Sequence, residues 1–306
     1  MHTNVCMSIA AFPRAWFITG VHGGLGRVIA DAALAHGHVV AGTVRAAADA
    51  EAFSERMPGR SHGLVADVTR EDQVRAAVEQ AIALMGRIDV VVNNAGYPFV
   101  GAVEELSDAE VRAQFDASVF GPWNVLRAVL PHLRARRSGH VIQMSSFAGF
   151  SASSGGGAEA ASKFALEGMS EALAFELGPL GVLVTVVEPG AFRPAASASA
   201  ARVAKRHIED YARGASSQHA RLAELDEHPA LDPTRLGEAL VALIEMKEPP
   251  VRLVLGDDAL HRARARLSWI RHELDAHESL SRATDFDGSR PGPDVAPFER
   301  PRFARR

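Results

Sequence analysis

The regular alternation of short apolar runs with amphipathic stretches constrains the fold of this chain more than any other feature. The apolar runs predict strands at residues 15–19, 38–43, 63–67, 88–92, 140–144, 182–187 and 251–255. The stretches between them carry apolar side chains at helical spacing and predict helices at residues 24–36, 46–56, 71–85, 107–136 and 159–177. Strands that alternate with helices form a parallel sheet with helices on both faces. We therefore predict an α/β fold with a doubly wound parallel sheet.

The remaining segments are less regular. Residues 192–248 are predicted to be helical with interruptions, and a bend in the helix 107–136 is expected near Gly121-Pro122. All 306 residues are assigned to one domain with its core at about 14–256, followed by a helical extension and tail at 257–306. Residues 288–306 are rich in proline and arginine, a composition typical of an extended or disordered tail.

Composition excludes several classes of protein. The net charge of −4 gives no reason to expect a nucleic-acid partner, which usually needs a basic face. The single cysteine, Cys6, cannot form an intrachain disulfide and fits a reducing cytoplasm. No apolar run approaches the roughly 18 residues of a membrane span, and the N-terminus lacks the pattern of a secretory signal. A cytoplasmic protein without a membrane or nucleic-acid partner is expected.

A glycine-rich turn joins the first predicted strand to the first predicted helix. It reads TGVHGGLG at residues 19–26. Glycines allow a tight turn and close approach to a pyrophosphate, and the helix N-terminus offers free N–H groups. Asp67 and the motif NNAG at 93–96 also stand at carboxyl ends of predicted strands, where such sheets bind ligands. The pattern predicts a dinucleotide site in a Rossmann-type domain, although Asp67 alone is equally typical of a cap at a strand end.

These motifs, together with Ser145-Ser146, Ser162-Lys163 and Pro189-Gly190, resemble the short-chain dehydrogenases/reductases over roughly residues 14–256. The resemblance implies a nicotinamide dinucleotide site and assigns a role to each matching residue. The residues expected to contact the phosphates are Gly20, Gly24, Leu25 and Gly26. The remaining cofactor contacts are expected from Asp67 and Val68 at the adenine, Asn93, Ala95 and Gly96 at the ribose, and Lys163, Pro189 and Gly190 near the nicotinamide.

The end of the second predicted strand bears on the choice of cofactor. An NAD site usually has a carboxylate there, which accepts hydrogen bonds from the ribose hydroxyls. Here the strand ends in Thr43, Val44 and Arg45. A guanidinium can bind a 2′-phosphate in a bidentate manner. NADP(H) is therefore predicted over NAD, with a solvated loop cation as the alternative reading of Arg45.

The catalytic positions depart from the family pattern. Lys163 and Ser146 match the family's lysine and serine, but Glu159 stands where the family has its catalytic tyrosine. Ser118 stands at the position of an asparagine that completes a proton relay, and Pro194 replaces a threonine that contacts the nicotinamide. The spacing of thirteen residues from Ser146 to Glu159 agrees with the family, so the replacement is not an error of alignment.

The replacement of tyrosine by glutamate changes the proton chemistry. A phenol has a pKa of about 10 and carries a proton at neutral pH, whereas a glutamate has a pKa of about 4.3. Glu159 and Lys163 stand four residues apart and can pair on one helix face, which would favour the carboxylate further. A carboxylate accepts a proton but cannot donate one, unless a desolvated pocket raises its pKa.

Other residues have plainer readings. The tyrosines Tyr97 and Tyr211 are candidates for pocket lining or packing, and a proton-transfer role for Tyr97 is an alternative. Ser118 is equally typical of a helix serine that bonds to its own backbone. The alternative for Glu159 is a structural ion pair with Lys163 in a site that has lost its activity. The 13 histidines show no metal-ligand spacing, so no metal site is predicted.

Three functions follow from these observations. The first is an NADP(H)-dependent oxidoreductase that acts on a carbonyl or secondary alcohol. Its candidate catalytic residues are Ser146, Glu159, Lys163 and Ser118, and Glu159, Tyr97 or water would replace the missing acid. The second is a redox-neutral dehydratase, isomerase or cyclase with Glu159 as general base, and the third is a non-catalytic dinucleotide-binding protein. By resemblance, residues 191–235 are expected to form a lid, whose small residues would admit a bulky apolar substrate. Helices 107–136 and 159–178 are expected to form a homodimer or homotetramer interface.

Overall fold

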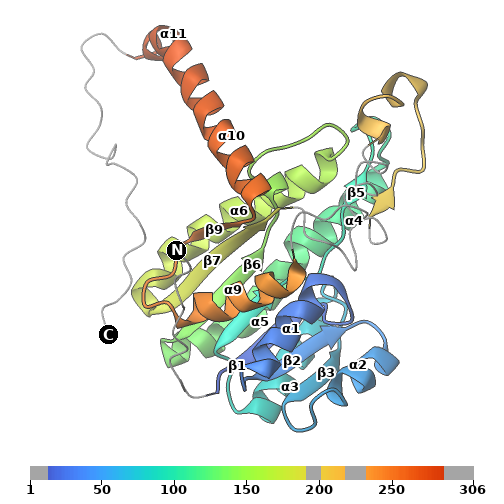
Figure 1. Ribbon diagram of the computed structural model, residues 1–306, viewed down its shortest axis with the longest axis vertical. Coiled ribbons are helices and arrows are strands. Elements are labelled where there is room, and N and C mark those ends of the chain that lie inside the picture. Colours follow the sequence, from blue (N-terminus) through green and yellow to red (C-terminus); the bar gives the residue numbers. More distant parts are fainter. Residues whose placement is uncertain (1–12, 191–200, 218–231, 286–306) are drawn as a thin grey trace.

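The computed structural model describes residues 13–190, 201–217 and 232–285 (Figure 1). Seven strands form one parallel sheet in the order β3-β2-β1-β4-β6-β7-β9. These strands are β1 (Ala15–Thr19), β2 (Val39–Val44), β3 (Ser61–Val65), β4 (Val90–Asn93), β6 (Gly139–Met144), β7 (Val182–Pro189) and β9 (Arg252–Leu255). The direction of progression reverses between β1 and β4, and sheets of this kind usually bind ligands at the carboxyl ends of the strands beside such a reversal. The predicted doubly wound α/β fold is confirmed.

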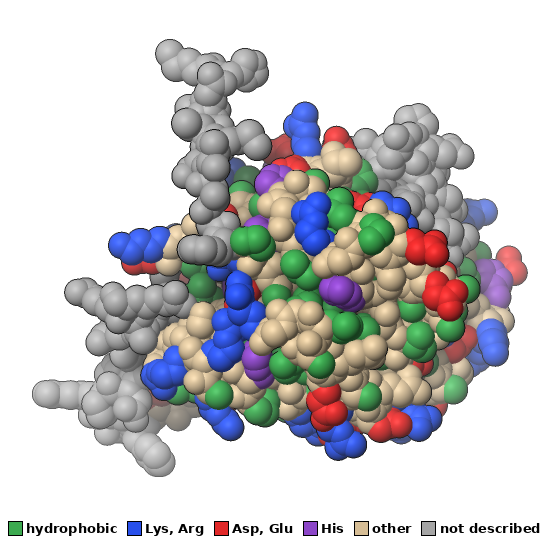
Figure 2. Space-filling model, turned by 90° about the horizontal axis from the view of Figure 1, so that it is seen from below, with side chains coloured by type: hydrophobic (Ala, Val, Ile, Leu, Met, Phe, Trp, Pro, Cys, Tyr) green, Lys and Arg blue, Asp and Glu red, His purple; other side chains and the backbone are tan. Residues whose placement is uncertain are grey.

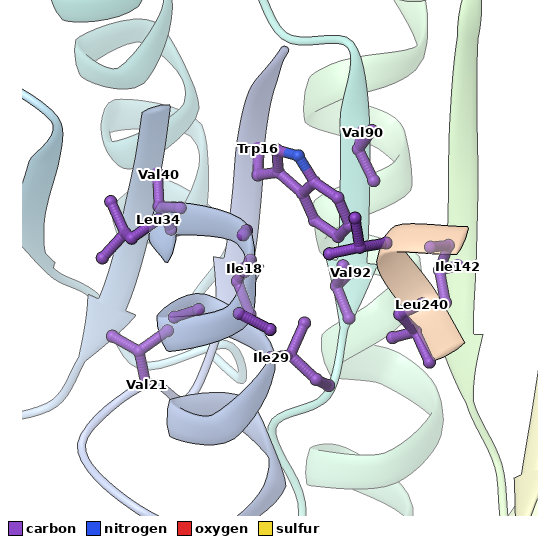
Figure 3. Packing of buried hydrophobic residues seen from close by; sticks show 14 of the residues in the cluster. Trp16, Ile18, Val21, Ile29, Leu34, Val40, Val90, Val92, Ile142 and Leu240 are labelled. Carbon is purple, nitrogen blue, oxygen red and sulfur yellow. The ribbon is translucent and has the colours of Figure 1, made fainter. Parts of the chain in front are cut away.

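Helices cover both faces of this sheet. One face carries α1 (Gly24–Ala35), α2 (Ala47–Ser54) and α9 (Pro233–Glu245), and the other carries α3 (Glu71–Met85), α5 (Gly121–Arg136) and α6 (Gly157–Leu177). Successive side chains of a strand point to opposite faces, so Trp16 and Ile18 of β1 join one apolar cluster while Phe17 joins the other. Figure 3 shows Trp16 and Ile18 packed with Ile29 of α1 and Leu240 of α9. The sheet is apolar on both faces because both are buried.

The long helix predicted from Ser107 is interrupted at its middle. Ser107 caps α4 (Asp108–Phe115) through the predicted capping box with Glu110. A π-helical turn at Asp116–Phe120 then leads into α5. Pro122 has no N–H to donate to the carbonyl four residues earlier, so the regular α-helical pattern cannot pass through this point. The turn contains Ser118, one of the candidate catalytic residues.

The segment after β7 differs from the expectation of an interrupted helix. Its described part contains β8 (Arg202–Val203), which pairs with β5 (Phe99–Val100) in a second, two-stranded sheet. Single 3-10 turns follow at Glu209–Tyr211 and Ala215–Ser217, and among the described residues of this segment the regular helix is α9. The helical prediction was therefore wrong for residues 201–217, because β5 provides a pairing partner distant in sequence. Residues 191–200 and 218–231, with Pro194, lie outside the described residues.

Two helices follow the sheet, α10 (Asp257–Ala276) and α11 (Glu278–Arg282). Helix α10 projects away from the rest of the molecule (Figure 1). Cys6 and the tail 288–306 lie outside the described residues. Among the described helices, none combines the length and apolar character needed to cross a bilayer. Basic and acidic side chains are interspersed across the face shown in Figure 2.

Candidate active site

The turn between β1 and α1 is packed too closely for side chains at some of its glycines. Gly20 and Gly24 have φ angles of 77° and 57°, in the left-handed region that favours glycine. A Cβ atom on Gly26 would lie 2.2 Å from the carbonyl oxygen of Gly20 and 2.4 Å from Nδ2 of Asn94. The turn is therefore held in a shape that only glycine permits at position 26.

Thr19 and Asn94 hold this turn against β4. The Asn94 side chain donates to the carbonyl oxygen of Thr19 at 2.9 Å, and the Thr19 hydroxyl accepts from the backbone N–H groups of Asn94 and Ala95 at 2.9 and 3.0 Å. Both residues belong to the motifs at 19–26 and 93–96, yet neither was predicted as a site residue. Their role depends on the pairing of β1 with β4, which brings the two motifs together.

The N-terminus of α1 fits a bound phosphate group. Gly23 caps this helix without a side-chain hydrogen bond, and no acidic residue stands in its first turn. The described residues place no hydrogen-bond acceptor at the N–H groups of Leu25 and Gly26. Free N–H groups and the positive end of the helix dipole favour an anion at this position. The shape and the charge of this turn therefore suit a pyrophosphate.

The other candidate adenosine-side residues surround the ends of β2 and β3. Thr43 is buried, and its carbonyl oxygen accepts from the N–H groups of Gly20 and Val21 at 3.0 and 3.1 Å. Arg45 follows β2 directly and is exposed. Asp67 lies two residues beyond β3, not at its end as predicted. These residues lie at one edge of the sheet, beside the glycine-rich turn.

Asp67 and its neighbour Val68 are partly occupied by structural contacts. The Asp67 Oδ1 atom accepts from the N–H and the hydroxyl of Thr69 at 2.9 and 2.8 Å, as in a capping turn. The Val68 side chain is buried, and its carbonyl oxygen accepts from Asn124 Nδ2 at 3.0 Å. The alternative role of Asp67, as a cap at a strand end, therefore accounts for its Oδ1 atom.

The ribose-side candidates follow β4 and β7. The Asn93 side chain is buried and donates to Gln143 Oε1 on the adjacent strand at 2.9 Å, so this amide lies within the sheet. Ala95 and Gly96 continue the chain beyond β4. Pro189 ends β7, and the Gly190 N–H donates to the carbonyl oxygen of Leu255 at 2.8 Å. These positions are brought together by the sheet order, although they are far apart in sequence.

Ser146 and Lys163 lie at the carboxyl end of β6. The Ser146 hydroxyl oxygen accepts from the Ala148 N–H at 3.2 Å, which leaves the hydroxyl proton available to a ligand. The Lys163 ammonium donates to the carbonyl oxygen of Met144 at 2.8 Å. Burial lowers the pKa of Lys163, while the carboxylates of Glu159 and Glu167 oppose that change. The two side chains therefore flank the end of one strand.

Glu159 lies in the first turn of α6, one helical turn before Lys163. The expected ion pair between them is not formed, since the Lys163 ammonium binds the Met144 carbonyl instead. No hydrogen bond reaches the Glu159 carboxylate from the described residues. Burial raises the pKa of Glu159, and the nearby Lys163 ammonium lowers it in part. This carboxyl group is consequently easier to protonate than an ordinary glutamate.

Ser118 belongs to a buried network of side chains. Its hydroxyl oxygen accepts from Nε2 of Gln114 at 2.9 Å, and the same nitrogen donates to the Ser162 hydroxyl at 3.0 Å. The Ser162 hydroxyl donates to the carbonyl oxygen of Glu159 at 2.8 Å. The network connects the π-helical turn to the start of α6. Ser118 is the acceptor in this bond, and among the described residues its hydroxyl donates no bond to a backbone carbonyl.

The two tyrosines are engaged in other contacts. The Tyr97 hydroxyl donates to the carbonyl oxygen of Ala113 at 3.3 Å, and the Arg202 guanidinium lies 3.8 Å from the centre of its ring. The Tyr211 hydroxyl donates to Glu104 at 3.0 Å. The contacts of Tyr97 hold its hydroxyl against α4, so they favour pocket lining over proton transfer.

Glu105 connects the described part of the expected lid to the body. This buried carboxylate accepts from the backbone N–H groups of Ala102 and Ile208 at 2.8 and 2.9 Å and from the Ser216 hydroxyl at 2.7 Å. These donors lower the pKa of Glu105. Glu105, which was not predicted from the sequence, therefore helps to hold residues 201–217, in addition to the pairing of β8 with β5.

A charged cluster behind Ser146 was also not predicted. Arg252 of β9 donates to both Glu167 of α6 and Glu188 of β7, and the Ser145 hydroxyl donates to Glu167 at 2.6 Å. A Cβ atom on Gly149 would lie 2.4 Å from Glu167 Oε1, so the turn after Ser146 packs closely on this carboxylate. An acidic residue inside the otherwise apolar strand VLVTVVEP was the signal available in the sequence.

Known proteins resemble this chain over most of its length. The family model for short chain dehydrogenases matches residues 14–204. A protein named 3-ketodihydrosphingosine reductase from Bacteroides thetaiotaomicron is 37% identical over 251 residues, which cover 80% of this chain and 88% of that protein. Oxidoreductase BOA17 from Botryotinia fuckeliana is 36% identical over 251 residues, which cover 82% and 91% of the two chains.

A solved structure agrees with these matches. The crystal structure of a short-chain dehydrogenase from Streptomyces avermitilis superposes with a TM-score of 0.83 at 38% identity. The superposition covers 89% of this chain and all of that protein.

Proposed function

Because this chain belongs to the short-chain dehydrogenase/reductase family of oxidoreductases, we propose that it binds NADP(H) and acts on a carbonyl or secondary alcohol through an atypical catalytic site. The observation that carries this proposal is the partly desolvated carboxyl group of Glu159. It stands one helical turn before Lys163, in the position of the family's tyrosine, and its pKa is raised by burial. This allows a glutamate to hold a proton that it can donate.

Residues at the carboxyl ends of the strands would hold the cofactor. The glycine-rich turn with Gly20, Gly24, Leu25 and Gly26 would bind the pyrophosphate at the N-terminus of α1. Thr43, Asp67 and Val68 would surround the adenosine, and Asn93, Ala95 and Gly96 would line the ribose. Pro189 and Gly190 would lie near the nicotinamide. The bound cofactor would supply or accept a hydride.

Arg45 supports NADP(H) over NAD. Its side chain is exposed at the end of β2, where an NAD site usually has a carboxylate. No acidic residue stands at the end of this strand, which finishes in Thr43 and Val44. A guanidinium at this position can bind a 2′-phosphate with two parallel hydrogen bonds.

Three side chains would handle the substrate oxygen and its proton. Ser146 would donate its free hydroxyl proton to the substrate oxygen. Glu159, protonated in reduction, would transfer its proton to that oxygen as negative charge develops there. The Lys163 ammonium would orient the cofactor ribose and influence the pKa of Glu159. In the oxidative direction, the Glu159 carboxylate would accept the proton.

Ser118 would act at a greater distance from the reacting atoms. Gln114 holds its hydroxyl, and the same amide reaches the carbonyl oxygen of Glu159 through Ser162. This network would fix the start of α6 and thereby the Glu159 backbone. The network through Gln114 and Ser162 would thereby offset the absence of the family's asparagine at position 118.

The substrate class follows from the relatives and from the lid. The name of the Bacteroides relative specifies reduction of 3-ketodihydrosphingosine, which supports a keto group on a bulky apolar molecule for this chain. A small-molecule substrate would lie under residues 191–235, of which 201–217 are fastened by Glu105.

The assembly is proposed to be a cytoplasmic homodimer or homotetramer. Exposed aromatic side chains on the outer surfaces of α5 and α6 support contact between subunits. They are Trp123, Phe164 and Phe175, which are 45%, 44% and 42% exposed.

The raised pKa of Glu159 also favours the redox-neutral alternative. A carboxylate with a raised pKa is a stronger base, so the same residue would abstract a proton in a dehydratase, isomerase or cyclase. Such an enzyme would form product while the amount of reduced cofactor stays constant.

The proposal is tested by cofactor binding and turnover together. NADPH and NADH are titrated by fluorescence, and absorbance at 340 nm is followed with long-chain and short-chain ketones. We expect tighter binding of NADPH than of NADH. Arg45→Ala should lower the ratio of the two affinities by about tenfold, equivalent to roughly 1.4 kcal/mol. Equal affinities would contradict the choice of NADP(H). Binding without turnover would support the non-catalytic reading.

Variants of Glu159 test the catalytic half of the proposal. Glu159→Gln should lower kcat by about 100-fold or more, the usual contribution of a general acid, with an unchanged Kd for NADPH. Reduction by the wild type should decline as pH rises through the raised pKa of Glu159, because the acid form is lost. Glu159→Tyr should move this decline to higher pH. A Glu159→Tyr variant with higher activity and an unchanged pH profile would show that Glu159 is not the working acid.

A further inference from the structure

Helix α10 carries a continuous apolar stripe that no other element of the described chain covers. The stripe consists of Leu260, Ala263, Leu267, Ile270 and Leu274, with alternating intervals of three and four residues. Its three leucines are exposed, with exposed fractions of 37% at Leu260, 56% at Leu267 and 66% at Leu274. Intervals that average 3.5 residues place these side chains on one line and are typical of helices that pair as coiled coils.

The helix has little support within its own subunit. Contact with the body lies near its first turns, where Ala259 is buried and the Arg262 guanidinium lies 4.6 Å from the centre of the Phe147 ring. Beyond these turns α10 projects from the molecule without a neighbouring element among the described residues (Figure 1). Most helical stability in proteins comes from packing of an apolar face. A projecting helix of 20 residues with such a stripe is therefore expected to pack against a partner.

The distribution of charge along α10 identifies the partner. Beyond its first turn, which carries Asp257 and Asp258 beside the body, the first half of α10 has the basic residues Arg262, Arg264 and Arg266. The second half has the acidic residues Glu273 and Asp275 together with Arg271. Two copies of this helix in antiparallel orientation place each basic half beside an acidic half. A parallel pair would place like charges side by side. The acidic half also disfavours adsorption of the helix on an anionic membrane, for which basic residues along the whole polar face are typical.

We propose that α10 joins two copies of this chain in an antiparallel pair, related by a twofold axis near Leu267 and Ile270. In the register that packs Leu267 against Ile270 of the second copy, Ala263 packs against Leu274. Arg266 and Glu273 lie on one edge of the stripe, so Arg266 of each copy faces Glu273 of the other. On the opposite edge Arg264 approaches Arg271 of the second copy, whose charge is offset by Asp275 of its own helix at 4.0 Å.

This contact is separate from the interface proposed on α5 and α6. It involves neither the glycine-rich turn nor Ser146, Glu159 or Lys163, so it does not depend on the proposed activity. If both interfaces form, pairing through α10 doubles the number of subunits in the assembly made by the interface on α5 and α6.

The first test is the mass of the full chain in solution. We expect Leu267→Glu to halve the mass measured by sedimentation velocity at micromolar concentration, with an association constant at least about tenfold weaker. The matched control is Leu280→Glu, because Leu280 is a leucine of similar exposure (69%) on α11, outside the stripe. This control should keep the wild-type mass. An unchanged mass in Leu267→Glu would overturn the proposal.

The second test exchanges the facing charges. Arg266→Glu and Glu273→Arg should each weaken association, and the double variant should restore it, because antiparallel pairing makes both new pairs attractive. Circular dichroism checks that each variant stays helical. A double variant weaker than either single variant would exclude the antiparallel pair. Flotation with anionic vesicles provides a further readout, and vesicle binding that Leu267→Glu abolishes, with an unchanged mass, would show that the stripe contacts a lipid surface instead.

Discussion

Glu159 shows how strongly the chemistry of one residue depends on its surroundings. A glutamate in water is ionised at neutral pH, and a lysine four residues later would be expected to keep it so. Here the Lys163 ammonium donates to the Met144 carbonyl instead, and burial raises the pKa of the Glu159 carboxyl group. The same substitution that would disable a tyrosine-dependent site can therefore leave a usable proton donor.

At the same scale, Gly26 provides a sharp prediction for the cofactor site. Gly26→Ala should lower the free energy of unfolding by about 1–3 kcal/mol, as overpacking usually does, because the new Cβ would lie 2.2 Å from the Gly20 carbonyl oxygen. The distortion of the turn should also weaken NADPH binding by more than tenfold, measured by fluorescence titration.

The control for this prediction is Gly23→Ala in the same turn. Gly23 has extended backbone angles, and a Cβ atom added to it would meet no other atom within 4 Å. Gly23→Ala should therefore bind NADPH nearly as the wild type does. Equal effects of the two substitutions would show that close packing at Gly26 does not define the site.

At the scale of elements, the charged cluster joins the pieces that carry the candidate catalytic residues. Arg252 of β9 connects Glu167 of α6 with Glu188 of β7, and Glu167 accepts from Ser145, the neighbour of the candidate residue Ser146. Burial and the neighbouring Glu167 raise the pKa of Glu188 to about 7, against the opposing effect of Arg252. Two buried carboxylates thus share the guanidinium of Arg252, whose own side chain is partly exposed.

This cluster predicts a pH dependence of stability. A carboxyl group with a raised pKa in the folded state costs stability when it ionises, so the cost is absent below about pH 4.5 and complete above about pH 7. Glu188→Gln removes the ionisation but keeps an oxygen that accepts from Arg252. The free energy of unfolding of the variant, relative to that of the wild type, should therefore increase by on the order of 1–3 kcal/mol from pH 5 to pH 8.

Urea unfolding at the two pH values measures this gain. The parallel variant Glu245→Gln serves as a control, since that carboxylate pairs with Arg14 at the surface. Its stability relative to the wild type should change little over the same range. A constant difference between Glu188→Gln and the wild type from pH 5 to pH 8 would contradict a raised pKa for Glu188.

For the whole molecule, the two apolar clusters on opposite faces of the sheet carry the fold. Leu240 of α9 is fully buried against Trp16 and Ile29 (Figure 3), so residues from both ends of the chain complete one cluster. Leu240→Ala should lower the free energy of unfolding by about 2–5 kcal/mol, because it removes buried contacts and leaves a cavity.

Chemical denaturation of the full chain measures this loss. Leu84→Ala provides the comparison, since Leu84 on α3 is 49% exposed and its substitution should cost less than about 1 kcal/mol. Similar losses for the two variants would mean that α9 is not part of the cooperative core.

The sequence by itself determined the sheet and the nucleotide motifs. Buried parallel strands must be apolar on both faces, and a glycine-rich turn between a strand and a helix has few alternative interpretations. Both features can therefore be recognised from local sequence patterns. The residues at the carboxyl ends of the strands could be named for the same reason. The boundaries of α2 and β3 shifted by one or two residues, because the end of an element depends on its neighbours.

Only the tertiary structure decided which side chains meet. The contact of Asn94 with Thr19, the partner of Lys163, the cluster around Arg252 and the pairing of β5 with β8 all join residues far apart in sequence. Such contacts depend on the order of the strands and on the crossing of helices, which no local pattern encodes. The raised pKa of Glu159 belongs to this group, since burial is a property of the folded chain.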